Sequence, residues 1–327
     1  MGDRRDWQCE RLGLAIVDVL TDVLHRARAR TALVRQLVQR PPWSITFADA
    51  PALTVMATLG GGASIRLHAS EIAPVGLAAG DIAVVTGTGA CTIADDPGTP
   101  VQITIRGGHK YLSDGQRTAG RRNLAPRTYG DGLPGATTMI RAAYELHGEV
   151  GRHVLALLPP LAVIPAGPRT RTALDLLATE VSRDEPGQDA VLTRLLDLML
   201  VLALRAWCAG SATLPAWYHA LDDPAIGEAL RALHADPARR WTVAALAAEL
   251  GLSRAAFAAR FTALVGEPPL TYLTNWRMTL AADLLQDTDH SVATVAREIG
   301  YSDPFAFSVA FKRTRGVNPS TWRRRLR

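Results

Sequence analysis

The pattern of apolar and polar positions divides the chain into stretches of different secondary structure. Apolar residues recur at helical spacing over residues 10–40, which predicts a helix first. From Trp43 to Ile105, short apolar and β-branched runs are separated by glycine- and proline-rich turns. That pattern is typical of a small antiparallel barrel or sandwich. Residues 106–135, rich in Gly, Arg and Pro, are expected to form a loop.

Helical periodicity returns after the loop. Residues 148–158, 170–185 and 189–208 each predict a helix, and the last has a wider apolar face than one neighbour requires. We interpret that face as part core and part dimer contact. Residues 209–223 have the composition of a linker, and the pattern is helical from Pro224 onward. The expected domains are residues 1–208 and 224–327, joined by a linker at 209–223.

A short helix-turn-helix pattern closes the chain. Asp303 stands where an N-cap belongs, and Pro304 occupies the first helical position, where its missing N–H costs nothing. Phe307 and Phe311 are four apart and share one helix face. A short amphipathic helix precedes Gly300, so the pair predicts a helix-turn-helix unit.

The same design occurs once before. Gly251 and the cap Ser253 precede a helix whose Phe257 and Phe261 repeat the four-residue spacing. A predicted helix of about 18 residues connects the two units and spans roughly 27 Å. That length suits two helices set about 34 Å apart, which is one turn of DNA. The repeat therefore predicts two recognition helices, about 253–264 and 304–315, in successive major grooves.

Charge is concentrated near the C-terminus. The 327-residue chain has a formal net charge of +5. Residues 297–327 contain eight basic and two acidic residues, so the rest of the chain is close to neutral. A local basic excess is the electrostatic footprint of a protein that binds a polyanion.

Cysteine usage and apolar runs restrict the compartment and the chemistry. The three cysteines are far apart and form no C-x-x-C pair, so neither a disulfide framework nor a cysteine zinc site is expected. The longest apolar run, Leu198–Ala206, is shorter than the roughly 20 residues that span a bilayer. No H-E-x-x-H, G-x-S-x-G or P-loop motif occurs. We expect a cytoplasmic protein with no membrane partner, metal, cofactor or catalytic site.

Distinctive motifs run through residues 222–327. They are Trp241-Thr242-Val243, Leu252-Ser253-Arg254, Gly266-Glu267-Pro268-Pro269, Ile299-Gly300-Tyr301, Ala310-Phe311-Lys312-Arg313 and Gly316-Val317-Asn318-Pro319-Ser320. By these motifs the stretch resembles the AraC/XylS family of bacterial transcription regulators. The first 200 residues are similar to the cupin-like sensor domain of one branch of that family, through Gly80-Asp81-Ile82 and Asp95-Asp96-Pro97-Gly98.

The resemblance implies both a fold and a function. The fold is α+β: an N-terminal cupin-like antiparallel β-barrel with helices, then a C-terminal all-α double helix-turn-helix domain. The function is sequence-specific binding of double-stranded DNA as a homodimer. It also implies an activator that contacts RNA polymerase and responds to a small-molecule or redox effector.

The family's groove-facing positions give the expected DNA contacts. They fall on Arg254, Ala255, Ala258, Ala259, Thr262, Ser302, Phe305, Ala306, Ser308, Val309, Lys312 and Arg313. Ala259 and Val309 stand where family members often carry a polar or basic side chain. Specificity is then expected from thymine-methyl contacts, Arg254, Ser308 and DNA shape. Phe305 has two interpretations, core packing or contact with a base methyl, and we favour the core. Residues 323–325, all arginines, favour a diffuse basic tail over direct phosphate contacts.

Cys91 and His68 are the effector or redox candidates. A cysteine on a strand is typically a buried small apolar side chain, and the alternative is an oxidant sensor, alone or with Cys9. Metal-dependent cupins need two or three histidines and a carboxylate. His68, Glu71 and His109 include no H-x-H pair, so a cupin enzyme fused to a DNA-binding module is the less favoured class. A third alternative makes the N-terminal domain an oligomerisation device only.

Overall fold

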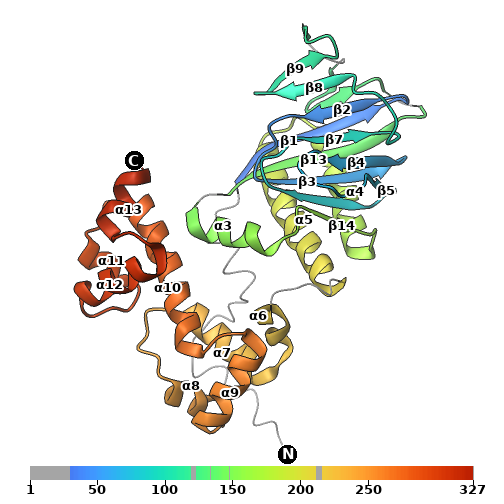
Figure 1. Cartoon of the computed structure of the whole chain (residues 1–327). Coiled ribbons are helices and arrows are strands. Elements are labelled where there is room, and N and C mark those ends of the chain that lie inside the picture. The colour runs from blue at the N-terminus through green and yellow to red at the C-terminus, as the bar shows by residue number, and fades with distance from the viewer. Residues whose placement is uncertain (1–29, 119–122, 133, 147, 211–215, 327) are drawn as a thin grey trace, which may run out of the picture. The chain divides into compact units, whose positions relative to one another are not determined.

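A computed structural model describes residues 30–118, 123–132, 134–146, 148–210 and 216–326 (Figure 1). The described residues form two compact units. One unit contains residues 30–146 and 155–210 and holds the strands. The other contains residues 148–154 and 216–326 and is helical.

Two seven-stranded sheets make up the first unit. Their strand orders are β11-β12-β1-β13-β3-β6-β14 and β10-β9-β8-β2-β7-β4-β5. Neighbours are antiparallel except for the parallel pairs β1–β12 and β2–β8. The strands are β1 (Arg30–Gln39), β2 (Ser44–Phe47), β3 (Leu53–Gly60), β4 (Ala63–Leu67), β5 (Val75–Leu77), β6 (Ile82–Thr86), β7 (Cys91–Ala94), β8 (Ile103–Arg106), β9 (His109–Leu112), β10 (Arg117–Thr118), β11 (Asn123–Ala125), β12 (Thr128–Gly130), β13 (Thr137–Glu145) and β14 (Leu161–Ile164).

The core of this unit lies between the two sheets. Ile65 and Ile93 of the sheet that contains β2, together with Trp43 just before β2, pack with Met56 and Met139 of the other sheet. All five side chains are almost fully buried. Successive side chains of a strand point to opposite faces, so one face of each sheet supplies this core. The predicted α+β class and β-rich N-terminal half are confirmed. The described strands form two packed sheets and do not close into one barrel.

Two predictions of secondary structure were wrong. Residues 30–39 form strand β1, whereas a helix was predicted over 10–40; residues 10–29 lie outside the described part. Val34 and Val38 are buried four residues apart. That spacing places two side chains on one face of a helix and equally on one face of a strand. Residues 30–39 form a strand because they pair with β13. The predicted loop at 106–135 contains strands β9 to β12.

Two helices, α4 (Pro168–Val181) and α5 (Gln188–Gly210), pack against each other and against the sheet that contains β1 and β3. Both confirm predicted helices. The phenol of Tyr144 on β13 donates a 2.8 Å hydrogen bond to the carbonyl of Leu196, which fixes α5 on the sheet. Leu192, Leu196 and Met199 of α5 are buried by this packing.

The second unit consists of helices. They are α6 (Ala216–His219), a 3₁₀ turn (Ala220–Asp222), α7 (Pro224–Ala235), α8 (Val243–Glu249), α9 (Arg254–Val265), α10 (Pro269–Asp287), α11 (Val292–Glu298), α12 (Pro304–Arg315) and α13 (Pro319–Leu326). Pairs α8–α9 and α11–α12 are the two predicted helix-turn-helix units, and α10 is the predicted connecting helix. Most of α3 (Gly148–Leu157) belongs to this unit. The carboxylate of Asp283 on α10 accepts hydrogen bonds from the backbone N–H groups of Glu149 and Val150.

Candidate nucleic-acid interface

Helices α9 and α12 begin and end alike. The Ser253 hydroxyl accepts a 3.2 Å hydrogen bond from the backbone N–H of Ala256. The Asp303 carboxylate accepts bonds of 2.9 and 3.1 Å from the N–H groups of Phe305 and Ala306. Each helix has 12 residues and ends at a glycine with positive φ. Both caps confirm the predicted helix starts, and an N-cap side chain satisfies amides that the helix itself leaves unpaired.

Aromatic pairs anchor both helices. Phe257 and Phe261 of α9, and Phe307 and Phe311 of α12, are fully buried. Each pair packs edge to face, with ring centroids 5.7 and 5.6 Å apart. Because these residues occupy one face of each helix, the opposite face of each is left in solvent.

The solvent-facing side of α12 combines apolar and basic side chains. Phe305 is 76% exposed and Val309 is 55% exposed. The favoured interpretation of Phe305 as a core residue was therefore wrong. The core positions are taken by Phe307 and Phe311, which lie about 200° and 240° away around the helix. The remaining predicted positions on this side, Ser302, Ala306, Lys312 and Arg313, are exposed as well. Ser308 is half-buried, and its hydroxyl donates a 2.8 Å hydrogen bond to the carbonyl of Pro304.

The solvent-facing side of α9 is formed largely by alanine. Arg254, Ala255 and Ala259 are exposed, whereas Ala258 and Thr262 are half-buried. The Thr262 hydroxyl donates a 2.8 Å hydrogen bond to the carbonyl of Ala258, so its proton is used within the helix. The remaining predicted positions on α9 except Arg254 are alanines, which have no polar side-chain group. Arg254 is therefore the predicted α9 residue whose polar group is not bonded to its own helix.

Two arginines outside the predicted set hold the helices in place. Arg260 of α9 donates from Nε to the carboxylate of Asp223, which also caps α7 through the N–H groups of Ala225 and Ile226. Although partial burial acts to raise it, the hydrogen bonds from Ile226 and Arg260 and the guanidinium charge hold the pKa of Asp223 below its ordinary value. The sequence pattern gives no signal for this pair, because Asp223 and Arg260 are 37 positions apart in the chain.

Arg277 of α10 connects the two helix-turn-helix units. It donates from Nε to the carbonyl of Pro237 at 2.6 Å and from a terminal nitrogen to that of Arg239 at 2.8 Å. Its guanidinium also lies 5.8 Å from the ring centroid of Tyr301, next to the turn at Gly300. The segment before α8 and the turn before α12 are thus tied to one helix.

The predicted basic tail is partly incorrect. Arg323 donates to the carbonyls of Leu285 and His290, at and just beyond the end of α10. These carbonyls have no partner within the helix, so Arg323 is a structural contact and not part of a diffuse tail. Arg324 is exposed.

The effector candidates lie at the adjoining ends of the paired strands β4 and β7, where the backbone N–H of His68 donates a 2.9 Å hydrogen bond to the carbonyl of Ala90, but their side chains have different surroundings. Cys91 is fully buried, and burial raises the pKa of its thiol to about 11, which the charge of Arg141 offsets only in part. That position favours a buried apolar role; Cys9 lies outside the described residues. His68 is exposed and hydrogen-bonded at 2.7 Å to the Thr92 hydroxyl. Among the described residues, no group of three or more His, Cys, Asp or Glu side chains is arranged to hold a metal ion.

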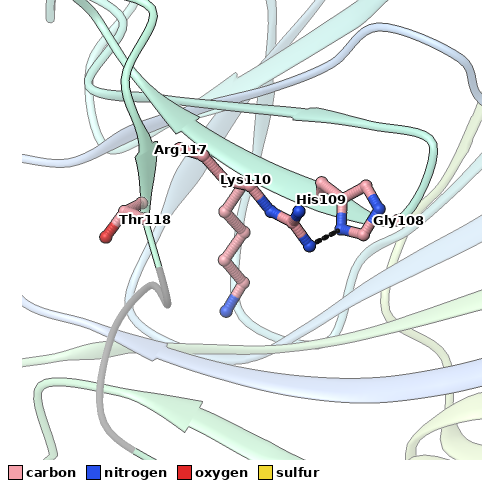
Figure 2. Close-up of a pocket in the computed structure, with 5 residues that line it drawn as sticks. All are labelled: Gly108, His109, Lys110, Arg117 and Thr118. Carbon is pink, nitrogen blue, oxygen red and sulfur yellow. Dashed lines mark hydrogen bonds between the residues drawn. The ribbon is translucent and has the colours of Figure 1, made fainter.

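A basic pocket of about 470 Å³ opens at the hairpin of β9 and β10 (Figure 2). Gly108, His109, Lys110, Arg117 and Thr118 line it. Arg117 donates a 2.8 Å hydrogen bond to Nδ1 of His109. The ammonium group of Lys110 lies 4.8 Å from the ring centroid of Tyr129, which Arg35 approaches to 5.7 Å. Composition and periodicity gave no signal for this pocket, because β9 and β10 fall in the stretch that was predicted to be a loop.

Comparison with known proteins assigns both halves of the chain. Residues 18–209 match the cupin family, and residues 246–325 match a helix-turn-helix domain family. A putative AraC-like transcription regulator of Streptomyces lividans is 33% identical over 94% of this chain and 98% of its own length. One from Streptomyces antibioticus is 32% identical over 94% of this chain and 99% of its own. The regulator AlkR of Acinetobacter baylyi is 34% identical over 56% of this chain and 61% of its own.

No helix in the described ranges combines the length and apolarity that a membrane crossing requires. The matches cover both units, and α9 and α12 are two helices of equal length, each with a side-chain N-cap and one exposed face, joined by one connecting helix. The chain therefore belongs to the AraC family of DNA-binding transcription regulators, with an N-terminal cupin domain and a C-terminal helix-turn-helix domain.

Proposed function

We propose that this regulator acts in the cytoplasm as a homodimer, places α9 and α12 of each protomer in successive major grooves, and activates transcription when its cupin domain binds an effector. The observation that carries the proposal is the pair of exposed helix faces on α9 and α12, in a unit where Arg277 of α10 contacts both the segment before α8 and the turn before α12. Two helices in one packed unit are proposed to present their exposed faces to DNA together. The basic side chains at the exposed end of α12 supply phosphate contacts.

Enrichment of bound sequences from a random duplex library tests the DNA contacts. We expect hydroxyl-radical protection of two segments about one helical turn apart for each protomer.

Lys312→Ala should weaken binding to all sequences alike and lower the slope of log affinity against log salt by about 1, because one phosphate contact is lost. Arg169→Ala is a matched control, since Arg169 is an exposed cation of the cupin domain. If Lys312→Ala leaves the slope of log affinity against log salt unchanged, Lys312 does not contact a phosphate.

An apolar row on α5 supports the dimer. Val191 and Leu198 are 43% and 46% exposed, and Leu195 and Leu202 between and after them are half-buried. The 4-3-4 spacing of these four residues is that of a two-helix coiled-coil seam. We expect α5 of a second copy of the chain to pack on this row, because the same spacing of apolar residues then faces it along the whole row. Sedimentation of the full chain measures the oligomeric state.

The basic pocket at β9–β10 supports an anionic effector. Arg117 and Lys110 contribute positive charge there, and Tyr129 adds an aromatic surface beside it. Carboxylates and phosphates are the groups that such cations recognise. A thermal-shift screen should find stabilisation by small carboxylated or phosphorylated compounds that Arg117→Ala abolishes. Stabilisation by neutral or cationic compounds alone would contradict an anionic effector.

Transcription measured in vitro with purified RNA polymerase tests the activator role. We expect added regulator to increase transcript from a promoter that carries an enriched site upstream, and the increase to depend on the stabilising compound. A decrease would identify a repressor. Transcription that does not depend on any compound would favour the cupin domain as an oligomerisation device only.

A further inference from the structure

Phe305 and Val309 form the most exposed apolar surface in the described part of the chain. At 76% and 55% exposure they exceed every other large apolar side chain there. They are one helical turn apart on α12, so their side chains adjoin. Single exposed apolar residues are ordinary, but two neighbours on one helix face form a continuous patch that water solvates poorly.

The patch occupies the part of α12 that would face the bases in the proposed complex with DNA. It lies opposite the buried faces of Phe307 and Phe311 and in the first half of the helix, and the N-terminal residues of a recognition helix are those that contact base edges. Lys312 and Arg313 follow on the next turn of the same exposed side. In a DNA groove the base edges lie between two rows of phosphates. An apolar patch can therefore face the bases while the cations beside it contact phosphates.

The chemistry of the two side chains selects one base. Neither Phe nor Val has a hydrogen-bond donor or acceptor, so neither can pair with the polar edges of guanine, adenine or cytosine. In the major groove, thymine alone presents an apolar group, its C5-methyl. We propose that α12 recognises thymine through this methyl group, with Phe305 and Val309 as the specificity-determining surface. The inference rests on the proposed DNA binding. It adds that the DNA segment contacted by α12 contains thymine.

Removal of methyl groups from the DNA tests the inference directly. The duplex that the wild-type chain enriches from a random library is resynthesised with deoxyuridine in place of thymidine, one position at a time. Each contacted methyl that is lost should weaken binding about fourfold, which is the effect of one buried carbon group. The sensitive positions should fall within the segment protected by α12. Replacing a sensitive thymidine by 5-methylcytidine should retain binding better than replacing it by cytidine, because the methyl is kept.

Variants assign the effect to the patch. Phe305→Ala and Val309→Ala leave the core intact, since both side chains are exposed, and alanine is a good helix former. The double variant should bind the thymidine duplex more weakly than the wild type does and should no longer discriminate uridine at the α12 positions. Leu270→Ala is the matched control, because Leu270 is 40% exposed on α10 and outside the recognition helices. It should leave the discrimination unchanged.

The outcomes separate this inference from the function on which it rests. Equal affinity of the wild type for thymidine and uridine duplexes overturns the inference and leaves DNA binding intact. Equal discrimination by the double variant also overturns it, because the methyls are then read elsewhere, as by the alanines of α9. Failure of the wild type to enrich any sequence overturns the proposed function and the inference together.

Discussion

A Cβ atom at Gly300 would lie well under 3.0 Å from the carbonyl oxygen of Ala238. Gly300 forms the turn between α11 and α12, whereas Ala238 precedes α8, so this approach joins the two helix-turn-helix units. Gly251, the corresponding turn residue of the first unit, has open space at its Cβ position. Both have positive φ, at 86° and 67°. The two glycines therefore differ in packing and share the same backbone requirement.

Alanine at the two turns should separate these effects. Gly251→Ala should cost about 1–2 kcal/mol, which is the penalty of a left-handed conformation for an L-residue. Gly300→Ala should cost more than that, because the backbone of Ala238 must also move. Urea unfolding of the full chain, followed by tryptophan fluorescence, measures the two losses. Equal losses would show that the close approach at Gly300 carries no energetic weight.

The row on α5 predicts a dimer contact. Leu198→Glu should shift the chain from dimer to monomer, because a carboxylate in an apolar seam loses its hydration without gaining a partner. Thr193→Glu is the control, since Thr193 is exposed on α5 but lies off the seam. Sedimentation velocity over a range of concentrations distinguishes the two. A Leu198→Glu chain that stays dimeric would place the interface elsewhere.

The Asp223–Arg260 pair predicts a pH dependence of stability. Because the pKa of Asp223 is lower in the folded chain than in the unfolded chain, this residue contributes stability above its unfolded pKa of about 3.9. The contribution is lost as the pH falls through the folded pKa. Asp223→Asn should therefore be less stable than the wild type at pH 7, and the difference should shrink toward pH 3. Urea unfolding at several pH values measures it, and a constant difference would contradict the prediction.

Cys91 should not behave as a redox sensor. With a thiol pKa of about 11, roughly 0.1% of the group is thiolate at pH 8, and the side chain has no solvent exposure. A maleimide should label Cys91 only as fast as the protein unfolds, and mass spectrometry of the digested protein identifies the labelled cysteine. Rapid labelling of Cys91 in the folded chain, or its oxidation by dilute peroxide without loss of structure, would restore the sensor interpretation.

Local signals in the C-terminal third were enough to predict its elements and to favour its role. The caps at Ser253 and Asp303, the paired phenylalanines and the turn glycines act within a few residues, so a pattern along the chain detects them. The secondary structure of the N-terminal half was harder to predict from local patterns. A four-residue apolar spacing fits a helix and a strand equally, so the pattern predicts a helix where β1 forms. The pairing of β1 with β13 depends on residues more than 90 positions away.

By itself, the sequence determined the order of domains and the two helix-turn-helix units, and it supplied the set of residues proposed as DNA contacts. Only the tertiary structure decided which of those residues face solvent: it exposed Phe305, turned the hydroxyls of Thr262 and Ser308 onto their own helices, and assigned Arg323 to the end of α10. The reason is physical. A cap or a helix period is set by neighbours in the chain, whereas burial and the choice of a hydrogen-bond partner are set by whatever the folded chain brings alongside.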